Sequence, residues 1–169
     1  MPLRLRPYVL ADERAALTVA EALRADQFTF LLGYEPTDEW ASFVAKIDDQ
    51  RRGVGVRPDM VRAAQLVADF DGVLVGRASI RFSLNEFLAT RGGHIGYGVA
   101  PQFRGRGFAT EILRQALVLA RSEGVNEVLM VCDDDNIASA KVIERCGGVL
   151  ESVVAASGDE PAYRRYWIN

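Results

Sequence analysis

The sequence has 169 residues, 49% of them hydrophobic and 25% charged, which is typical of a globular protein and predicts one domain over residues 1–169. Its net charge of −3 argues against a general nucleic-acid or membrane-surface partner. Because Cys132, Cys146 and the single histidine, His94, form no ligand cluster, and the sequence pattern contains neither a signal peptide nor a membrane span, we expect no metal and a cytoplasmic protein with reduced thiols.

Hydrophobic periodicity and turn residues predict alternating helices and strands in the first 100 residues. In chain order we expect a strand over 3–6, a helix from the N-cap Asp12 to about residue 25, a helix over 38–51, strands over 64–70 and 73–82 joined by the Asp71-Gly72 turn, a loop or short helix over 83–92, and a strand over 93–100. The connector over 28–34 is rich in aromatic residues, so Phe28 and Phe30 are either a core plug or one wall of an acceptor pocket.

The last third of the chain continues the alternation. We expect a helix over 108–124, a buried strand over 127–132, a helix over 136–146, and strands over 149–155 and 163–168 that form a hairpin around Ser-Gly-Asp-Glu-Pro. This order predicts an α/β fold with a mixed sheet of about six to seven strands flanked by helices.

The turn before the helix over 108–124 carries the clearest chemical signal, and its sequence is Arg104-Gly105-Arg106-Gly107-Phe108-Ala109. The first N–H groups of a helix have no internal partner, and the helix dipole adds partial positive charge there. Gly105 and Gly107 let the backbone approach a phosphate closely, and Arg104 and Arg106 add charge-assisted donors. The turn therefore predicts a pyrophosphate site.

The spacing of this turn narrows the choice of ligand. No Lys-Ser or Lys-Thr pair follows the glycines, and Thr110 replaces the third glycine of a dinucleotide fingerprint. The pattern is Arg-x-x-Gly-x-Ala after Val99 and Pro101, and a second pattern, Asn-Ile-Ala-Ser over 136–139, follows one strand later. Together the two patterns resemble the coenzyme A signature of the GNAT (Gcn5-related) N-acetyltransferases. From about residue 66 onward the chain resembles a bacterial subgroup of predicted acetyltransferases.

The resemblance implies acetyl-CoA as the cosubstrate. It also implies that the fourth and fifth strands, over 94–100 and 127–132, splay apart with the pantetheine arm between them. The backbone at Val99 would pair with the arm, the turn and the Thr110 hydroxyl would bind the pyrophosphate, and Asn136 would contact the arm with Ser139 nearby. Asn136 also suits the N-cap of its helix. The implied cofactor-binding residues are Val99, Arg104, Gly105, Arg106, Gly107, Phe108, Ala109, Thr110, Asn136 and Ser139.

Acetyl transfer to an amine needs a base for the amine and a proton for the leaving thiolate. Glu86 and His94 are the candidate bases, with a solvated loop carboxylate and a structural histidine as the alternatives. Many GNAT enzymes carry a tyrosine four residues after the position of Ser139, where this chain has Ile143. Tyr97 would replace it only if its side chain faced the cleft, and we expect a core position instead.

The predicted acceptor-binding residues are Phe28, Phe30, Asn85, Glu86 and Asp133. Asp133 begins an acidic run that would either attract a cationic substrate or form a solvated turn. We therefore predict direct acetyl transfer to a primary amine of a small, cationic acceptor, such as an aminoglycoside antibiotic or another amine metabolite. The alternatives are a protein or peptide N-acetyltransferase and a non-catalytic acetyl-CoA sensor. The aromatic C-terminus is expected to serve either the core or a homodimer interface.

Overall fold

The computed structural model describes residues 2–169. The strands are β1 (Arg4–Pro7), β2 (Ala63–Phe70), β3 (Val73–Arg81), β4 (Ile95–Val99), β5 (Val128–Asp133), β6 (Val149–Val154) and β7 (Tyr163–Ile168). The α-helices are α1 (Glu13–Arg24), α2 (Trp40–Arg52), α3 (Phe108–Ser122) and α4 (Ile137–Arg145). Three short helical turns are η1 (Leu10–Asp12), η2 (Leu88–Gly92), which is π-helical, and η3 (Pro101–Phe103).

The strands form two antiparallel sheets, with the orders β1-β2-β3-β4 and β5-β7-β6. The α/β class and the seven strands are confirmed. The two sheets divide between β4 and β5, the strands that were expected to splay apart, and every strand pair in the described residues is antiparallel. β4 and β5 approach each other at their first residues, where the His94 N–H donates to the Leu129 carbonyl oxygen over 2.8 Å. No ladder continues from this contact within residues 2–169, so the facing edges of β4 and β5 keep unpaired backbone groups.

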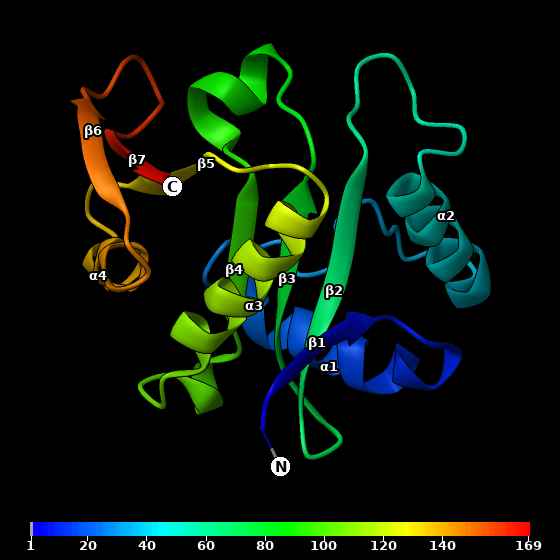
Figure 1. Cartoon of the computed structure of the whole chain (residues 1–169). Helices are drawn as coiled ribbons and strands as arrows, with labels where there is room; N and C mark the ends of the chain where they lie inside the picture. The colour runs from blue at the N-terminus through cyan, green and yellow to red at the C-terminus, as the bar shows by residue number, and fades with distance from the viewer. Residues whose placement is uncertain (1) are drawn as a thin grey trace.

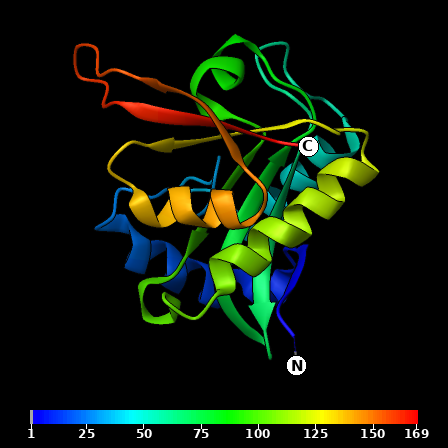
Figure 2. The same ribbon diagram turned by 60° about the vertical axis from the view of Figure 1, so that its left-hand side comes forward.

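Helices cover both faces of the four-stranded sheet. α1 and α2 pack on β3 and β2, and α3 packs on the other face against β3 and β4. Figure 1 shows α3 in front of this sheet and α1 behind it. α4 packs against α3 and β5, and Figure 2 shows the two helices side by side. The turn before α3 therefore lies near the start of α4, although 30 residues of chain separate Gly107 from Ile137.

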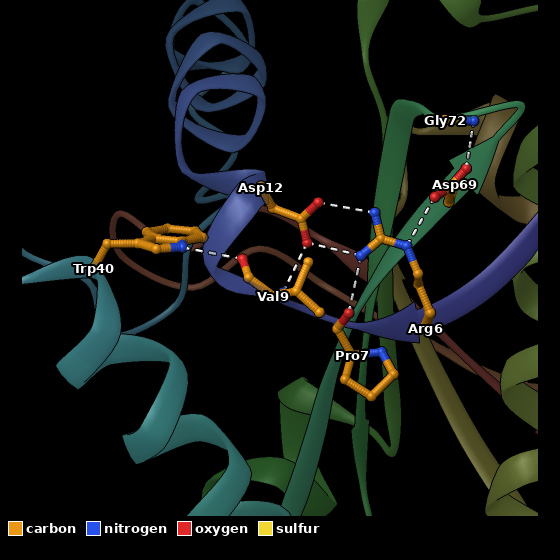
Figure 3. A network of polar contacts seen from close by, with 7 residues as sticks. All are labelled: Arg6, Pro7, Val9, Asp12, Trp40, Asp69 and Gly72. Carbon is orange, nitrogen blue, oxygen red and sulfur yellow. Dashed lines mark hydrogen bonds and ion pairs between the residues drawn. The ribbon is translucent and has the colours of Figure 1, made fainter.

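A buried ionic network ties the start of the chain to β2 (Figure 3). The Arg6 guanidinium donates two hydrogen bonds to the Asp12 carboxylate, at 2.7 and 2.8 Å, and a third to Asp69 at 2.8 Å. Asp12 was expected to cap α1, but its side chain makes no capping bond to that helix. Its carboxylate instead accepts from the Val9 N–H over 2.8 Å, because the bidentate arginine holds it back toward β1.

Gly76 allows β3 and β4 to pack closely. A methyl group at Gly76 would overlap the Gly98 carbonyl oxygen and lie 3.2 Å from the Ile112 side chain. Gly76→Ala is therefore expected to lower the free energy of unfolding by about 2 kcal/mol, since β4 must shift to accept the methyl group. Urea unfolding measures this. Gly55→Ala, where no atom lies within 4 Å, is the control and should cost less, about 1 kcal/mol, through its positive φ alone. Equal losses in the two variants would contradict the packing argument.

Candidate functional site

The Arg104–Ala109 turn has the geometry of an anion site. Gly105 and Gly107 have φ values of 73° and 81°, in the left-handed region that favours glycine, and no atom lies within 4 Å of a methyl group built at either. Gly107 is the N-cap residue of α3. The first N–H groups of α3 have no acceptor within the helix. They lie at an open surface, because no side chain covers the glycine turn.

A cavity of about 590 Å³ lies between this turn, β4 and α4. Its walls include every predicted cofactor-binding residue except Arg106, namely Val99, Arg104, Gly105, Gly107, Phe108, Ala109, Thr110, Asn136 and Ser139. Arg106 instead places its guanidinium 5.1 Å from the centre of the Phe108 ring. The two sequence patterns, 30 residues apart, therefore meet at one cavity.

The charged residues of the cavity wall favour an anion. Arg104 donates to the Asp26 carboxylate over 2.5 Å and to the Val99 carbonyl oxygen over 3.1 Å, so its charge is largely balanced within the protein. Lys141 and Arg145 also line the cavity, and they lie one turn apart on α4. The sequence analysis did not predict these two cations as site residues. Their i, i+4 spacing on the helix that begins near Ser139 is the signal that could have identified them.

The open edge of β4 forms the floor of the cavity. Ala100 donates to the Val75 carbonyl oxygen over 2.9 Å, so even-numbered residues of this strand direct their backbone groups toward β3. By alternation, Tyr97 and Val99 direct theirs toward the gap between β4 and β5. An extended chain in this gap would find backbone donors and acceptors there.

Tyr97 was expected in the core, and it packs against the main core cluster but also lines the cavity. Its hydroxyl lies 2.9 Å from the Ser139 Oγ and 3.4 Å from the Ser139 carbonyl oxygen. Burial raises the pKa of Tyr97 to about 12, and the hydrogen bond to Ser139 opposes part of this rise. The phenol is therefore protonated at neutral pH. Asn136 fixes the neighbouring turn, because its Oδ1 accepts from the Ser139 N–H over 3.1 Å as the N-cap of α4.

Comparison with known families decides the identity of this arrangement. The family model for the acetyltransferase (GNAT) domain matches residues 3–149. The chain belongs to the GNAT acetyltransferases. Members of this family use acetyl-CoA as the cosubstrate, so the expected family, enzyme class and cosubstrate are confirmed. A search of curated protein sequences gave no significant match.

Solved GNAT structures share the fold at low sequence identity. RimJ from Mycobacterium smegmatis, in complex with CoA-disulfide, is 19% identical with a TM-score of 0.73, and the match covers 98% of this chain and 81% of RimJ. The Salmonella typhimurium acetyltransferase that modifies the N-terminal serine of ribosomal protein L7/L12 is 20% identical with a TM-score of 0.70, over 98% and 94% of the two chains. The putative acetyltransferase yncA from Salmonella typhimurium, with acetyl-CoA, is 18% identical with a TM-score of 0.66, over 99% and 93%.

Ile143 occupies the position at which many GNAT enzymes carry a tyrosine. It belongs to α4, and its side chain is fully buried in the core and does not line the cavity. A methyl group at Gly148 would overlap it, so this part of α4 is closely packed. In this GNAT chain the hydroxyl-bearing residues that line the cavity are Tyr97 of β4, Thr110 of α3 and Ser139 at the start of α4.

The two aromatic residues of the α1–α2 connector take different roles. Phe30 is 1% exposed in the core between α1, α2 and the sheet, so it is the expected core plug. Phe28 lines the cavity and lies against Gly98, where a methyl group would overlap its ring. The Arg77 guanidinium lies over the Phe28 ring, 4.5 Å from its centre. Only Phe28 is thus placed as a wall.

The GNAT cavity does not include Glu86 or Asn85 among its lining residues. Glu86 is exposed at a second depression beside η2, with Arg91, Glu160 and Tyr163. The Asn85 side chain accepts from the Leu88 N–H over 2.9 Å and donates to the Asp59 carbonyl oxygen over 3.1 Å, which stabilises the turn before η2. The expected catalytic role of Glu86 and the acceptor-binding role of both residues stay predictions.

His94 joins the two sheets in this structure. It is 7% exposed, and its Nδ1 accepts from the Leu129 N–H over 2.9 Å. Burial and the nearby Arg81 lower the pKa of His94, so the ring is neutral at pH 7 with its proton on Nε2. Neither nitrogen of that tautomer is then available as a base, and the geometry does not support the expected catalytic role.

Two carboxylates of the acidic run at the end of β5 are held in ion pairs. Asp133 lies 3.4 Å from an Arg91 nitrogen, and Asp134 lies 2.7 Å from the Arg164 Nε. These ion pairs weaken the attraction for a cationic substrate that the sequence suggested. Among residues 2–169, no group of three or more His, Cys, Asp and Glu side chains is arranged to hold a metal ion. In the same part of the chain, no helix combines the length and apolar character needed to cross a membrane.

Proposed function

We propose that this protein transfers the acetyl group of acetyl-CoA directly to the primary amine of a small molecule in the cytoplasm. The observation that carries the proposal is the joining of three features at one cavity: the helix N-terminus with its glycine turn, the open edge of β4, and the Tyr97–Ser139 hydroxyl pair. The turn would hold the pyrophosphate of CoA, with Lys141 and Arg145 adding positive charge. The edge of β4 would pair with the pantetheine amides, and the hydroxyl pair would face the thioester.

The hydroxyl pair favours an enzyme over a non-catalytic acetyl-CoA sensor. The thiolate that leaves during acetyl transfer needs a proton or a hydrogen-bond donor. With isoleucine at position 143, the tyrosine found in many GNAT enzymes is missing from α4, and that absence was the main support for the sensor. Tyr97 and Ser139 supply such a donor from the same cavity. The amine would lose its proton to solvent or to a carboxylate such as Glu86.

A protein N-terminus is the second candidate acceptor. One observation favours it: the L7/L12 acetyltransferase, whose match covers 98% of this chain, is among the structural neighbours. Aminoglycosides and other amine metabolites remain within the first candidate. Release of CoA thiol from acetyl-CoA, measured across amino acids, polyamines, aminoglycosides and N-terminal peptides, separates the classes. Tight acetyl-CoA binding without turnover on any of these amines would contradict the enzyme proposal.

The cofactor assignment makes its own prediction. The double variant Lys141→Gln/Arg145→Gln is expected to raise the KM for acetyl-CoA roughly tenfold, because two exposed charges near the phosphates are lost. The KM for the acceptor should stay within about twofold of its original value. Steady-state kinetics at two salt concentrations measure both, and the difference between proteins should shrink at high salt. Arg121→Gln, at the opposite end of α3, is the control. An unchanged KM for acetyl-CoA would show that these cations do not face the cofactor.

A further inference from the structure

Two arginines on β3, Arg77 in the core and the half-buried Arg81, have no acidic partner among residues 2–169. Arg77 is 5% exposed; its nitrogens donate to the Thr29 carbonyl oxygen at 2.7 Å and the Gly96 carbonyl oxygen at 3.3 Å, and its Nε has no acceptor. Arg81 reaches the Gly92 carbonyl oxygen at 3.5 Å. The ion pairs found within residues 2–169 include neither guanidinium. Buried cations are normally paired, because an uncompensated charge is costly to remove from water.

The two guanidiniums converge on β4 beside the candidate active site. A methyl group built at Gly96 would lie 3.3 Å from one Arg81 nitrogen and 3.7 Å from an Arg77 nitrogen. Gly96 and Arg81 are each half-buried, so this point is not sealed from solvent. It precedes Tyr97, whose side chain lines the cavity on the α4 side of the strand. Side chains alternate along a strand, so the arginines lie on the opposite side of β4, under the α1–α2 connector that carries Phe28.

The electrostatics of this place are one-sided. Burial lowers the pKa of Arg77 to about 10, with the nearby Arg81 charge adding to the fall and Tyr8 opposing it. Burial also lowers the pKa of Arg81, and no carboxylate offsets it. Both guanidiniums are still charged at pH 7, while Asp133 and Asp134 are already held by Arg91 and Arg164. The uncompensated charge near β4 is therefore positive.

We propose that Arg77 and Arg81 bind a carboxylate carried by the acceptor, so that the substrate is an amino-acid-like molecule with an amine and an anionic group. This inference rests on the proposed acetyl transfer and names the chemical class of its acceptor. A carboxylate at Gly96 would complete the hydrogen bonds of the forked donors. It would also hold the amine end of the molecule across β4 from the Tyr97–Ser139 pair. The acceptor is then neutral or negative overall, in contrast to the cation that the sequence suggested.

The test compares each acid with its own amide. L-Amino acids, their carboxamides and O-phosphoethanolamine are offered with acetyl-CoA, and CoA-thiol release is recorded. At least one amino acid should show kcat/KM on the order of 10- to 100-fold above its amide, with most of the difference in KM. Equal use of acid and amide, a preference for amines without an anionic group, or a preference for the phosphate over every carboxylate would overturn the proposal.

Variants locate the effect. Arg81→Gln should bring the acid-to-amide ratio of kcat/KM close to one, and Arg81→Lys should retain part of the preference because it keeps the charge. Arg121→Gln, whose residue donates to the Asn169 carbonyl oxygen far from β4, is the matched control and should keep the full ratio. A fall of the same factor for acid and amide in Arg81→Gln would indicate a purely structural arginine and would overturn the proposal.

Binding separates this inference from the proposed function. If no amine is turned over, calorimetric titration of N-acetyl amino acids and their amides into the CoA-bound wild-type protein still tests the arginines. Acids that bind at least about tenfold more tightly than their amides support the carboxylate site even though the acetyl transfer has failed. Acids that bind no more tightly than amides overturn it. The same titration serves if Arg81→Gln does not fold.

Discussion

Tyr97→Phe is expected to lower kcat about 100-fold while the KM for acetyl-CoA changes little. The reason lies in the chemistry of the leaving group. A thiolate forms as the acetyl group departs, and a donor at the cavity wall stabilises it in the transition state more than in the bound substrate. Tyr97 keeps its proton at neutral pH because burial raises its pKa to about 12.

The Tyr97–Ser139 pair presents a free O–H for every arrangement of its protons. If the Ser139 hydroxyl donates across the 2.9 Å contact, the Tyr97 proton is left for the cavity. If Tyr97 donates to the Ser139 Oγ or to the carbonyl oxygen at 3.4 Å, the Ser139 proton is left instead. Removal of one hydroxyl therefore disturbs the other. We expect Ser139→Ala to be impaired as well, and the double variant to lose less than the two single losses combined.

Single-turnover acetyl transfer, started from the preformed acetyl-CoA complex, measures the chemical step directly. Tyr166→Phe is the matched control, because it removes the hydroxyl of another buried tyrosine, which donates to Glu144 over 3.1 Å outside the cavity. That variant should keep kcat within about threefold even if its stability falls. A Tyr97→Phe enzyme that transfers acetyl at the original rate would remove the tyrosine from the chemistry and leave solvent to protonate the thiolate.

The cofactor half of the site was predictable because it is made of local backbone structure. A glycine turn that opens a helix has the same shape wherever it occurs, so Gly105 and Gly107 could be interpreted from their spacing alone. The N-cap at Asn136 is equally local, since its Oδ1 bonds to an N–H only three residues away. The helix and strand order followed from periodicity in the same way.

The acceptor half depended on which side of the sheet each residue faces. Tyr97 and Gly96 are neighbours in the sequence, yet one faces α4 and the other faces the α1–α2 connector. The face of the sheet to which each residue points is fixed by the β3–β4 register, which pairs Ala78 with Tyr97 and Ser79 with Gly96. No local sequence pattern predicts that register. Phe28 and Phe30 show the same limit, because two residues along one connector separate the cavity wall from the core.

Arg77 and Arg81 could not be identified from sequence for a further reason. A strand with alternating arginines normally indicates a solvated face, and β3 contains Arg77 and Arg81 four residues apart. In the structure the α1–α2 connector covers this face, and a carbonyl oxygen at Thr29, 48 residues away, receives the Arg77 bond. Long-range contacts of this kind determine the burial of Arg77, and that burial, together with the lack of an acidic partner for either arginine within residues 2–169, makes the two charges informative.

Arg6→Met is expected to lower the free energy of unfolding by about 3 kcal/mol at pH 7, the largest stability effect we anticipate in this chain. Arg6 satisfies both Asp12 and Asp69, whose side chains are 8% and 6% exposed. Methionine fills similar space but leaves two buried carboxylates facing each other without a cation (Figure 3). The expected loss of about 3 kcal/mol lies at the lower end of the range for breaking a buried ion pair, because Arg6 itself is 24% exposed and water reaches part of the network.

The loss should depend on pH in a defined direction. The Arg6 hydrogen bond lowers the pKa of Asp69 despite the opposing effect of burial. For Asp12, burial would raise the pKa, but the bonds from Arg6 and from the Val9 N–H outweigh it, so the net shift is downward. A carboxyl whose pKa is lower in the folded state stabilises the fold above its unfolded pKa, about 3.9, and loses that contribution as the pH falls through the folded value.

Urea unfolding of the wild type and Arg6→Met at pH 7, 5, 4 and 3 follows this dependence. The wild type should lose stability below about pH 4, whereas the variant should lose less, because protonation relieves its unpaired carboxylates. The gap between the two proteins therefore narrows with acid. Arg52→Met breaks an exposed pair with Asp48 and Asp49 on α2 and should cost less than about 1 kcal/mol at every pH. A gap that stays constant from pH 7 to pH 3 would mean that Arg6 stabilises the fold by packing its side chain, and that the charges of Asp12 and Asp69 contribute little.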